Sequence, residues 1–175
     1  MQGQPKLIAV VGPTASGKSE LAVFLAKQIK KHQWGGYKGA EIISADSRQV
    51  YKYLDVGTNK VAGEWQRIDK TCKQKLEKLH LFAIAKRCSL CVFMYQNIQH
   101  HCIDFVHPRK TFTVADFKQC AQKAIAEITN RGNLLMLVGG TGFYIQAVTD
   151  NLLLPKVPPN KKLRAQLGKK TTSEL

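Results

Sequence analysis

The sequence contains no long apolar run. No stretch approaches the roughly 18 consecutive apolar residues expected of a membrane-spanning helix, and residues 1–12 lead directly into a strand-like segment rather than a targeting peptide. We therefore expect a cytoplasmic protein that has no membrane partner. With 44% hydrophobic and 22% charged residues, the 175-residue chain has the composition of an ordinary globular protein and the length of one core domain.

Acidic residues are scarce. The chain has 12 Asp and Glu against 27 Lys and Arg, which gives a formal net charge of +15. This excess goes beyond what solubility requires and favours a polyanionic partner, with nucleic acid ahead of other classes. Charge alone leaves open a simple crowd of solvated lysines. We expect the chain to be a monomer.

The cysteines do not form a recognisable framework. Five are present, an odd and clustered set, so we expect a reducing compartment and no closed set of disulfides. Cys88 and Cys91 form one CxxC pair, but a second pair is missing, and we favour free thiols over zinc ligands. The further ligands that a zinc site could recruit are Cys72, His80, His100, His101 and Cys102. We expect the adjacent His100 and His101 to be structural hydrogen-bond partners.

Hydrophobic periodicity, together with the glycine-containing segment GPTASGKS at residues 12–19, predicts an α/β fold with a P-loop NTPase-like core, a parallel sheet flanked by helices. Residues 7–11 read as a buried parallel strand, and apolar residues then recur at helical spacing over 21–29. A second strand over 41–44 delivers ADSRQVY at its C-terminal end, the end that faces the ligand in open α/β sheets.

The second half repeats the order of strand, glycine turn and helix. A helical face begins after Thr113, which forms a capping box with Asp116, and the helix ends near Gly132. Residues 134–138 form a continuous apolar strand, and GGTG leads into a helix that begins near Phe143.

The middle of the chain is less regular. Residues 61–99 are lysine-rich, and we predict an irregular or helical insertion with a helix over 64–80. We divide the chain into a core over 1–150 and the start of a second region over 151–175, where the composition shifts and no further element is completed.

The sequence GPTASGKS matches the phosphate-binding pattern GxxxxGK[ST], and it lies between a predicted strand and a predicted helix. Its backbone N–H groups would converge on phosphate oxygens at a helix N-terminus, Lys18 would neutralise phosphate charge, and Ser19 would offer its hydroxyl to Mg²⁺. The predicted diphosphate-binding residues are Gly12, Pro13, Thr14, Ala15, Ser16, Gly17, Lys18 and Ser19.

Asp46 follows the second predicted strand and should face the phosphate site. Its carboxylate could bind Mg²⁺ or accept a proton, whereas an aspartate at a strand end is also a common turn residue. Spacing alone does not separate these readings.

Six motifs occur in an order that resembles the tRNA dimethylallyltransferases, also called tRNA isopentenyltransferases. They are GPTASGKS, ISADSRQVY, LDVGTNK, HHCID, TVADF and GGTGFYIQA. The resemblance implies transfer of a dimethylallyl group from dimethylallyl diphosphate to the exocyclic amine of the adenosine 3′ to the anticodon, with Mg²⁺ as cofactor and the tRNA anticodon arm as partner. Two features depart from the family pattern. One is the longer segment between LDVGTNK and HHCID, and the other is the end of the chain, since family members continue past residue 175. The resemblance therefore implies a P-loop catalytic core over 1–150 and, over 151–175, the start of a truncated C-terminal region that contacts tRNA.

The same resemblance implies roles for individual residues. Asp46 matches the general base, Lys18 acts on the diphosphate, and Thr141 lies near both substrates. The residues implied to contact tRNA are Asp46, Ser47, Arg48, Gln49, Thr141 and Arg164.

Three other functions stay open at this point. A related prenyltransferase could act on free adenylate, a small-molecule kinase could use the P-loop for ATP, and an RNA-binding protein could keep the fold without turnover. Asp104 and the positive charge favour tRNA over free nucleotide, and the SADSRQVY and GGTGFY motifs argue against a kinase.

Overall fold

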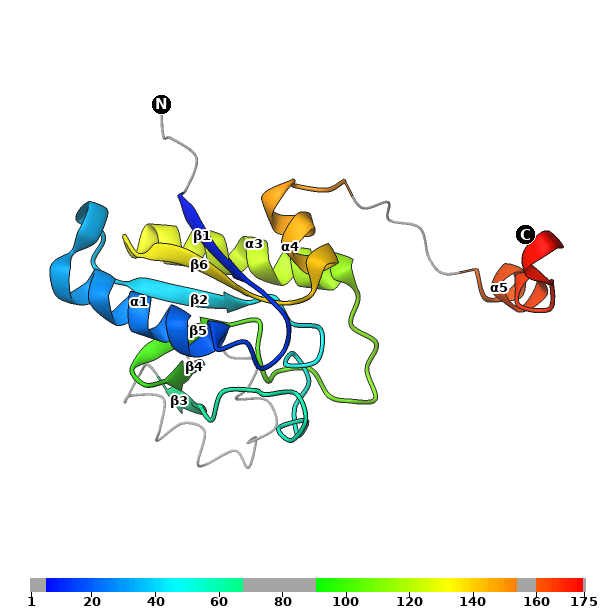
Figure 1. The fold of residues 1–175 in the computed structure, drawn as a ribbon, viewed down its shortest axis with the longest axis horizontal. Helices are drawn as coiled ribbons and strands as arrows, with labels where there is room; N and C mark the ends of the chain where they lie inside the picture. Colours follow the sequence, from blue (N-terminus) through cyan, green and yellow to red (C-terminus); the bar gives the residue numbers. More distant parts are fainter. Residues whose placement is uncertain (1–5, 68–90, 154–159, 175) are drawn as a thin grey trace, which may run out of the picture.

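The fold is built on a six-stranded, mostly parallel sheet (Figure 1). The computed structural model describes residues 6–67, 91–153 and 160–174. In spatial order the strands are β1 (Leu7–Val11), β6 (Leu134–Gly139), β2 (Ala40–Ser44), β5 (Ile98–His101), β4 (Cys91–Tyr95) and β3 (Glu64–Arg67). The helices are α1 (Lys18–His32), η1 (Trp34–Gly36), α3 (Val114–Asn130), α4 (Gly142–Thr149), α5 (Lys161–Leu167) and η3 (Thr172–Glu174).

Strand direction divides the sheet into two parts. β1, β6, β2 and β5 run parallel, whereas β4 and β3 are antiparallel additions at one edge. The predicted α/β class with a parallel sheet is therefore confirmed. The predicted helix over 64–80 is wrong at its start, because residues 64–67 form β3, and its remainder lies outside the described residues. The rest of the predicted insertion, for which no helix was predicted, holds β4 and the start of β5.

Helices cover both faces of the sheet. Strand side chains alternate between the faces, so Ile42 packs with α1 in one core cluster and Ile43 packs with α3 and α4 in the other. In the second cluster the rings of Phe117 and Tyr144 stack at 4.1 Å between centroids, which joins α3 to α4. β2 and β6 are buried along their whole length, as expected for central parallel strands.

β1 differs from its prediction as a buried strand. It is parallel, but it is an edge strand, and Ile8 and Val11 are exposed. The apolar run LIAVV is typical of a strand with neighbours on both sides, whereas the described residues supply a neighbour only in β6.

The capping box that begins α3 is present as predicted. The Thr113 side chain accepts the Asp116 N–H at 3.3 Å, and the Asp116 carboxylate accepts the Thr113 N–H at 2.8 Å. These bonds satisfy two backbone donors that a helix start otherwise leaves unpaired.

A buried polar cluster joins β2 to β5 and to the turn that follows α3. The Glu41 carboxylate accepts hydrogen bonds from His101 at 2.7 Å, from Arg131 at 2.8 and 2.9 Å, and from Asn133 at 2.7 Å. Burial by itself raises the Glu41 pKa, but these donors outweigh it and lower the pKa to about 2. His101 therefore has the structural role that we expected.

His100 is also a structural residue. It is buried, and its Nδ1 lies 3.0 Å from the Ile98 carbonyl oxygen. Burial lowers its pKa to about 4, against the opposing effect of that hydrogen bond. The imidazole is therefore neutral at neutral pH.

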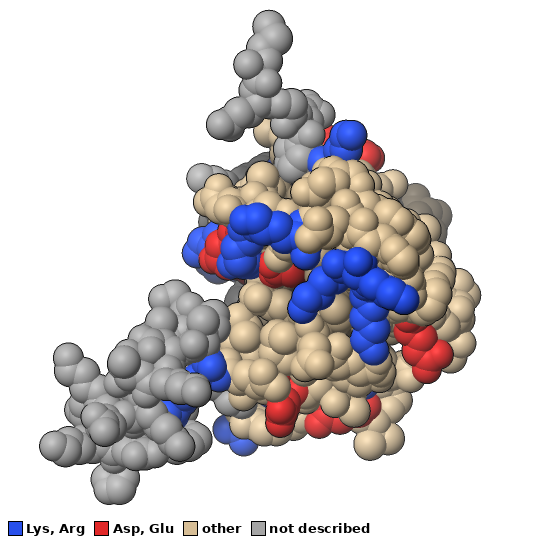
Figure 2. All heavy atoms as spheres, turned by 90° about the vertical axis from the view of Figure 1, so that its left-hand side faces the viewer, with Lys and Arg blue, Asp and Glu red and all other residues tan. Residues whose placement is uncertain are grey.

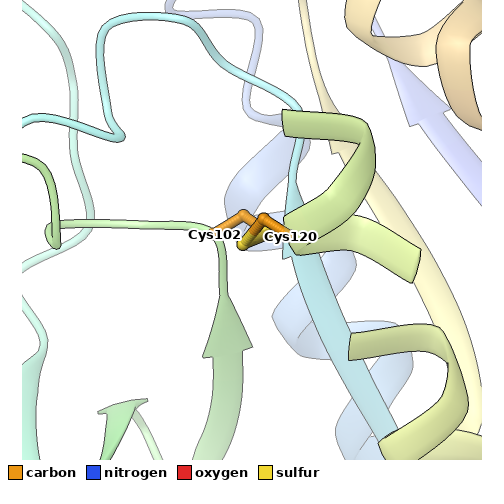
Figure 3. The surroundings of a disulfide bond; sticks show 2 residues. All are labelled: Cys102 and Cys120. Atoms are coloured by element: carbon orange, nitrogen blue, oxygen red, sulfur yellow. A yellow bond between two sulfur atoms is a disulfide. The ribbon is translucent and has the colours of Figure 1, made fainter. Parts of the chain in front are cut away.

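A disulfide links Cys102, which follows β5, to Cys120 on α3 (Figure 3). We expected no closed set of disulfides and did not predict this bond, because residues 18 apart in the sequence meet only through the packing of α3 on the sheet. Cys91 is a free thiol in β4, and Cys88 lies outside the described residues. Among the described residues, no helix is long and apolar enough to span a bilayer.

Candidate active site

Three loops meet at the C-terminal edge of the parallel strands. β1 ends beside β6, with Val11 paired to Gly139, and β2 ends beside β6, with Ser44 paired to Val138. The P-loop, the turn that contains Asp46 and the loop before α4 therefore lie side by side. This edge is where open α/β sheets bind their ligands.

The two glycines after β6 allow these loops to approach closely. A Cβ at Gly139 would lie 2.2 Å from the Ala45 carbonyl oxygen, and one at Gly140 would lie 2.8 Å from the Gly12 carbonyl oxygen. Both contacts are with backbone, which cannot move aside as a side chain can. Packing therefore requires glycine at the first two positions of GGTG, because a side chain at either position would clash with backbone.

The P-loop has the backbone of a phosphate-binding loop. Gly17, the N-cap of α1, has φ 78°, and Ala15 has φ 63°, in the left-handed region that a residue with a Cβ rarely adopts. Such turns direct successive N–H groups inward to form a concave anion site. The Lys18 ammonium donates a hydrogen bond to the Pro13 carbonyl at 2.6 Å, which folds this side chain over its own loop.

Asp46 caps a turn through one carboxylate oxygen. Its Oδ1 accepts the N–H of Arg48 at 2.8 Å and the N–H of Gln49 at 3.3 Å. No described residue donates a hydrogen bond to the other carboxylate oxygen, Oδ2. The turn reading and the proton-acceptor reading are therefore compatible, since one oxygen orients the group and the other stays available.

Thr141 joins the loop after β6 to the Asp46 turn. Its hydroxyl accepts the N–H of Ser47 at 3.0 Å and donates to the Ser47 Oγ at 3.3 Å. Thr141 is also the N-cap of α4. The two predicted site residues are thus held in a fixed relation.

Gln49 ties residues 54–60 to the sheet. Its Oε1 accepts the Ser44 hydroxyl at 3.1 Å, and its Nε2 lies 3.2 Å from the carbonyl oxygens of both Thr58 and Asn59. Gln49 is buried, and its amide is fully engaged inside the protein. It therefore has a structural role that was not predicted, since only a contact with tRNA was expected of it.

Sequence reasoning missed the anchor of the same loop. The Lys60 side chain is only 3% exposed and its ammonium binds the Tyr51 carbonyl oxygen at 2.7 Å, Asp55 at 2.7 Å and Asp104 at 3.1 Å. The Trp65 indole N–H donates to the Asp104 carboxylate at 2.9 Å. In the sequence, Lys60 is distinguished only by its position directly after GTN, which does not indicate that it is buried.

Two adjoining pockets open at this edge, and Asp46 lines both. The first, of about 260 Å³, lies over the P-loop and is lined by Thr14, Ala15, Ser16, Gly17, Lys18, Ser19, Glu20, Asp46, Gln49, Thr58 and Asn59. The second, of about 280 Å³, is lined by Pro13, Thr14, Asp46, Ser47, Arg48, Gly57, Thr58, Gly140 and Thr141. A group bound in one pocket could thus react with a group bound in the other beside the Asp46 carboxylate.

Most of the predicted site residues come together here, with two exceptions. Gly12 lines neither pocket and instead contacts the backbone of Gly140. Arg164 lies on α5, which Figure 1 draws away from the sheet, so it is not brought to either pocket.

The fold and this edge define an α/β protein with a P-loop beside a carboxylate. A family model described as IPP transferase matches residues 93–175. The tRNA dimethylallyltransferase of Acaryochloris marina is 38% identical over 163 residues, which cover 93% of this chain and 41% of the relative. That of Cyanothece is 35% identical over 175 residues, 100% of this chain and 46% of the relative.

Solved structures of related enzymes are similar in fold to this chain. The tRNA isopentenylpyrophosphate transferase of Bacillus halodurans is 33% identical, with a TM-score of 0.61, covering 94% of this chain and 42% of that protein. A eukaryotic dimethylallyltransferase shares the fold, with a TM-score of 0.61 at 24% identity, covering 96% of this chain and 33% of that protein. The chain is a homologue of the tRNA dimethylallyltransferases of the IPP transferase family, and it spans about two fifths of the length of these curated relatives.

Proposed function

We propose that this chain supplies the donor site and the general base of a tRNA dimethylallyltransferase. The observation that supports this most strongly is the position of Asp46 between the P-loop pocket and the second pocket. A transfer reaction needs a donor and an acceptor on either side of a proton acceptor. The two adjoining pockets match that need.

In the proposed reaction, the exocyclic amine of adenosine attacks C1 of dimethylallyl diphosphate. The N–C bond forms as the C–O bond to diphosphate breaks, and the amine proton passes to the Asp46 carboxylate. Oδ2 is the oxygen suited to receive it, because Oδ1 already accepts two backbone N–H groups. A base held in this way contributes roughly 10² to 10⁴ in rate.

The P-loop would hold the leaving group. Backbone N–H groups of the loop and the Lys18 ammonium, which already lies over the loop at Pro13, would stabilise the charge that develops on the departing diphosphate. Fixed donors of this kind are most effective where charge appears in the transition state. The first pocket is polar and lined by the loop, as a diphosphate site requires.

Ser19 would be the protein ligand of Mg²⁺. Ser19 lines the first pocket together with Asp46, so the available donors are oxygens, which this cation prefers. When bound, Mg²⁺ would neutralise diphosphate charge.

We infer that the acceptor is tRNA. The similarity to tRNA dimethylallyltransferases supports this over a free nucleotide, as does the net charge of +15. Ser47, Arg48 and Thr141 line the second pocket and would contact the nucleotide there. Arg164 would contact the RNA elsewhere.

The acceptor class is tested by supplying labelled dimethylallyl diphosphate and Mg²⁺ with tRNA, AMP and ATP in parallel reactions. Label should appear in tRNA alone. Label in AMP or ATP would instead assign the chain to the nucleotide prenyltransferases, and phosphate transfer from ATP to a small molecule would assign it to the kinases.

A further inference from the structure

A basic surface lies at the end of α1 that is remote from the P-loop. Lys30 and Lys31 are in the last turn of the helix, and Lys38 follows on the segment that leads to β2; all three are exposed. Figure 2 views the molecule from this end, where blue side chains gather. None of the three forms an ion pair with a described residue.

The three lysines belong to one surface. The Lys30 side chain packs near Gly39, next to Asn133, and the Lys38 side chain packs against Gly132, in the turn that leads from α3 to β6. The Lys38 N–H also donates to the Gly132 carbonyl at 3.1 Å. Lysines in a last helical turn stabilise the helix dipole by a few tenths of a kcal/mol to about 1 kcal/mol. Lys38 lies outside the helix and has no such role.

An exposed aromatic side chain follows α1, in η1 and three residues after Lys31. Trp34 is 52% exposed, and its ring stacks on that of His32 with centroids 5.5 Å apart and planes within 14°. Trp34 also borders a shallow groove of about 570 Å³ between β1 and α1, which Ile8, Leu25, Ile29 and Tyr37 line. An exposed aromatic face among unpaired lysines is the combination that binds single-stranded nucleic acid.

The distance between this surface and the candidate active site sets the minimum size of a partner that contacts both. α1 begins in the P-loop at Lys18 and ends at His32, and a helix of its length spans about 22 Å. A free nucleotide cannot contact both ends of α1 at once. A folded RNA can.

We propose that Lys30, Lys31, Lys38 and Trp34 form a second RNA-binding surface, here called the α1 platform. The lysines contact the sugar-phosphate backbone, and an unpaired base stacks on Trp34. The three ammonium groups, which form no ion pair with a described residue, are complementary in charge to a phosphate backbone, and this complementarity favours RNA as the partner. The identity of this RNA as tRNA rests on the proposed function.

The experiment measures tRNA binding by the 175-residue chain across a range of salt concentrations. The test variant is Lys30→Glu with Lys31→Glu, and the matched control is Lys110→Glu with Lys123→Glu, two exposed lysines elsewhere. We expect the test variant to bind tRNA about 10- to 100-fold more weakly than the control and to lose roughly 1.5 from the salt slope. Trp34→Ala should weaken binding about 10-fold.

Equal tRNA affinity in the test and control variants would overturn the α1 platform, and unchanged affinity in Trp34→Ala would overturn the stacking contact. A larger loss on vesicles that contain phosphatidylserine than on tRNA would replace RNA by a membrane surface. Binding of dimethylallyl diphosphate is measured on the same samples and should be equal in all of them. Failure of the parent chain to bind that diphosphate would count against the proposed function and not against the platform.

Discussion

At the scale of single residues, the site depends on how Asp46 divides its hydrogen bonds. One carboxylate oxygen fixes the turn through two N–H groups, and Thr141 fixes the same turn through Ser47. The phosphate-binding motif predicted Lys18 as a site residue, and the family resemblance implied Asp46. Neither could predict that Asp46 lines two pockets, because the second pocket is formed by loops far apart in the sequence.

Asp46→Asn should abolish transfer to tRNA while binding of dimethylallyl diphosphate is nearly unchanged. The amide keeps the size of the side chain and an oxygen that can accept the turn N–H groups, but it cannot take up the proton. We expect single-turnover transfer to slow by roughly 10² to 10⁴. Turnover within a few-fold of the parent would remove Asp46 from the mechanism.

At the scale of elements, the loop over residues 54–60 is positioned by long-range contacts. Gln49 and Lys60 hold this loop through hydrogen bonds. Thr58 and Asn59 of the loop line the P-loop pocket. Helices and parallel strands left periodic signals that predicted them well, and local chemistry predicted the capping box of α3. The contacts of Lys60 left no such signal, because its partner Asp104 is 44 residues away.

Lys60→Met should destabilise the protein and weaken diphosphate binding together. Methionine fills a similar volume but leaves the partly buried Asp104 carboxylate without its cation, at a cost of roughly 3 kcal/mol. Urea unfolding and diphosphate binding measure the two effects. Lys123→Met, at an exposed lysine of α3, is the control and should change neither. Equal losses in both variants would show that the Lys60 contacts have no special weight.

The antiparallel strand β3 was missed for a related reason. Residues 64–67 have no clear alternation of apolar and polar side chains, and they form a strand by pairing with β4. β4 is different, because the continuous apolar run CVFMY at 91–95 is itself typical of a strand, and the prediction overlooked it. The Cys102–Cys120 pairing likewise depends on where α3 packs. Tertiary contacts decide such elements, and local sequence does not record them.

Stability should fall on acidification in two successive stages. His100 has an ordinary pKa of 6.5 and a folded-state pKa of about 4, so the unfolded chain takes up a proton first as the pH drops below 6.5. Glu41 behaves in the same way between its ordinary pKa of 4.5 and about 2. Each group contributes on the order of 3 kcal/mol to the free energy of unfolding. This contribution is present above the group's ordinary pKa and is lost as the pH falls from the ordinary pKa to the folded-state pKa.

Urea unfolding at pH 7, 5.5 and 4.5 measures the first stage. His100→Gln should remove most of the pH dependence between 6.5 and 4, whereas Glu41→Gln should leave it in place. A His100→Gln variant with the same pH dependence as the parent would contradict the assignment.

At the scale of the whole molecule, the candidate active site and the α1 platform lie at opposite ends of α1. Their separation favours a partner that spans the protein, and the net charge of +15 favours a polyanion. Composition alone predicted the charge of the partner. It could not place the lysines, whose surface depends on the packing of α1 and of the turn that leads from α3 to β6.

The most direct test of the central claim is the affinity of the 175-residue chain for dimethylallyl diphosphate with Mg²⁺, measured by calorimetry on the parent, Lys18→Ala and Asp46→Asn. Loss of a charged hydrogen bond costs roughly 1.5 to 3 kcal/mol, so Lys18→Ala should bind about 10- to 100-fold more weakly, while Asp46→Asn binds like the parent. A parent chain that binds ATP but not dimethylallyl diphosphate, or a Lys18→Ala variant that binds the diphosphate as well as the parent, would contradict the account.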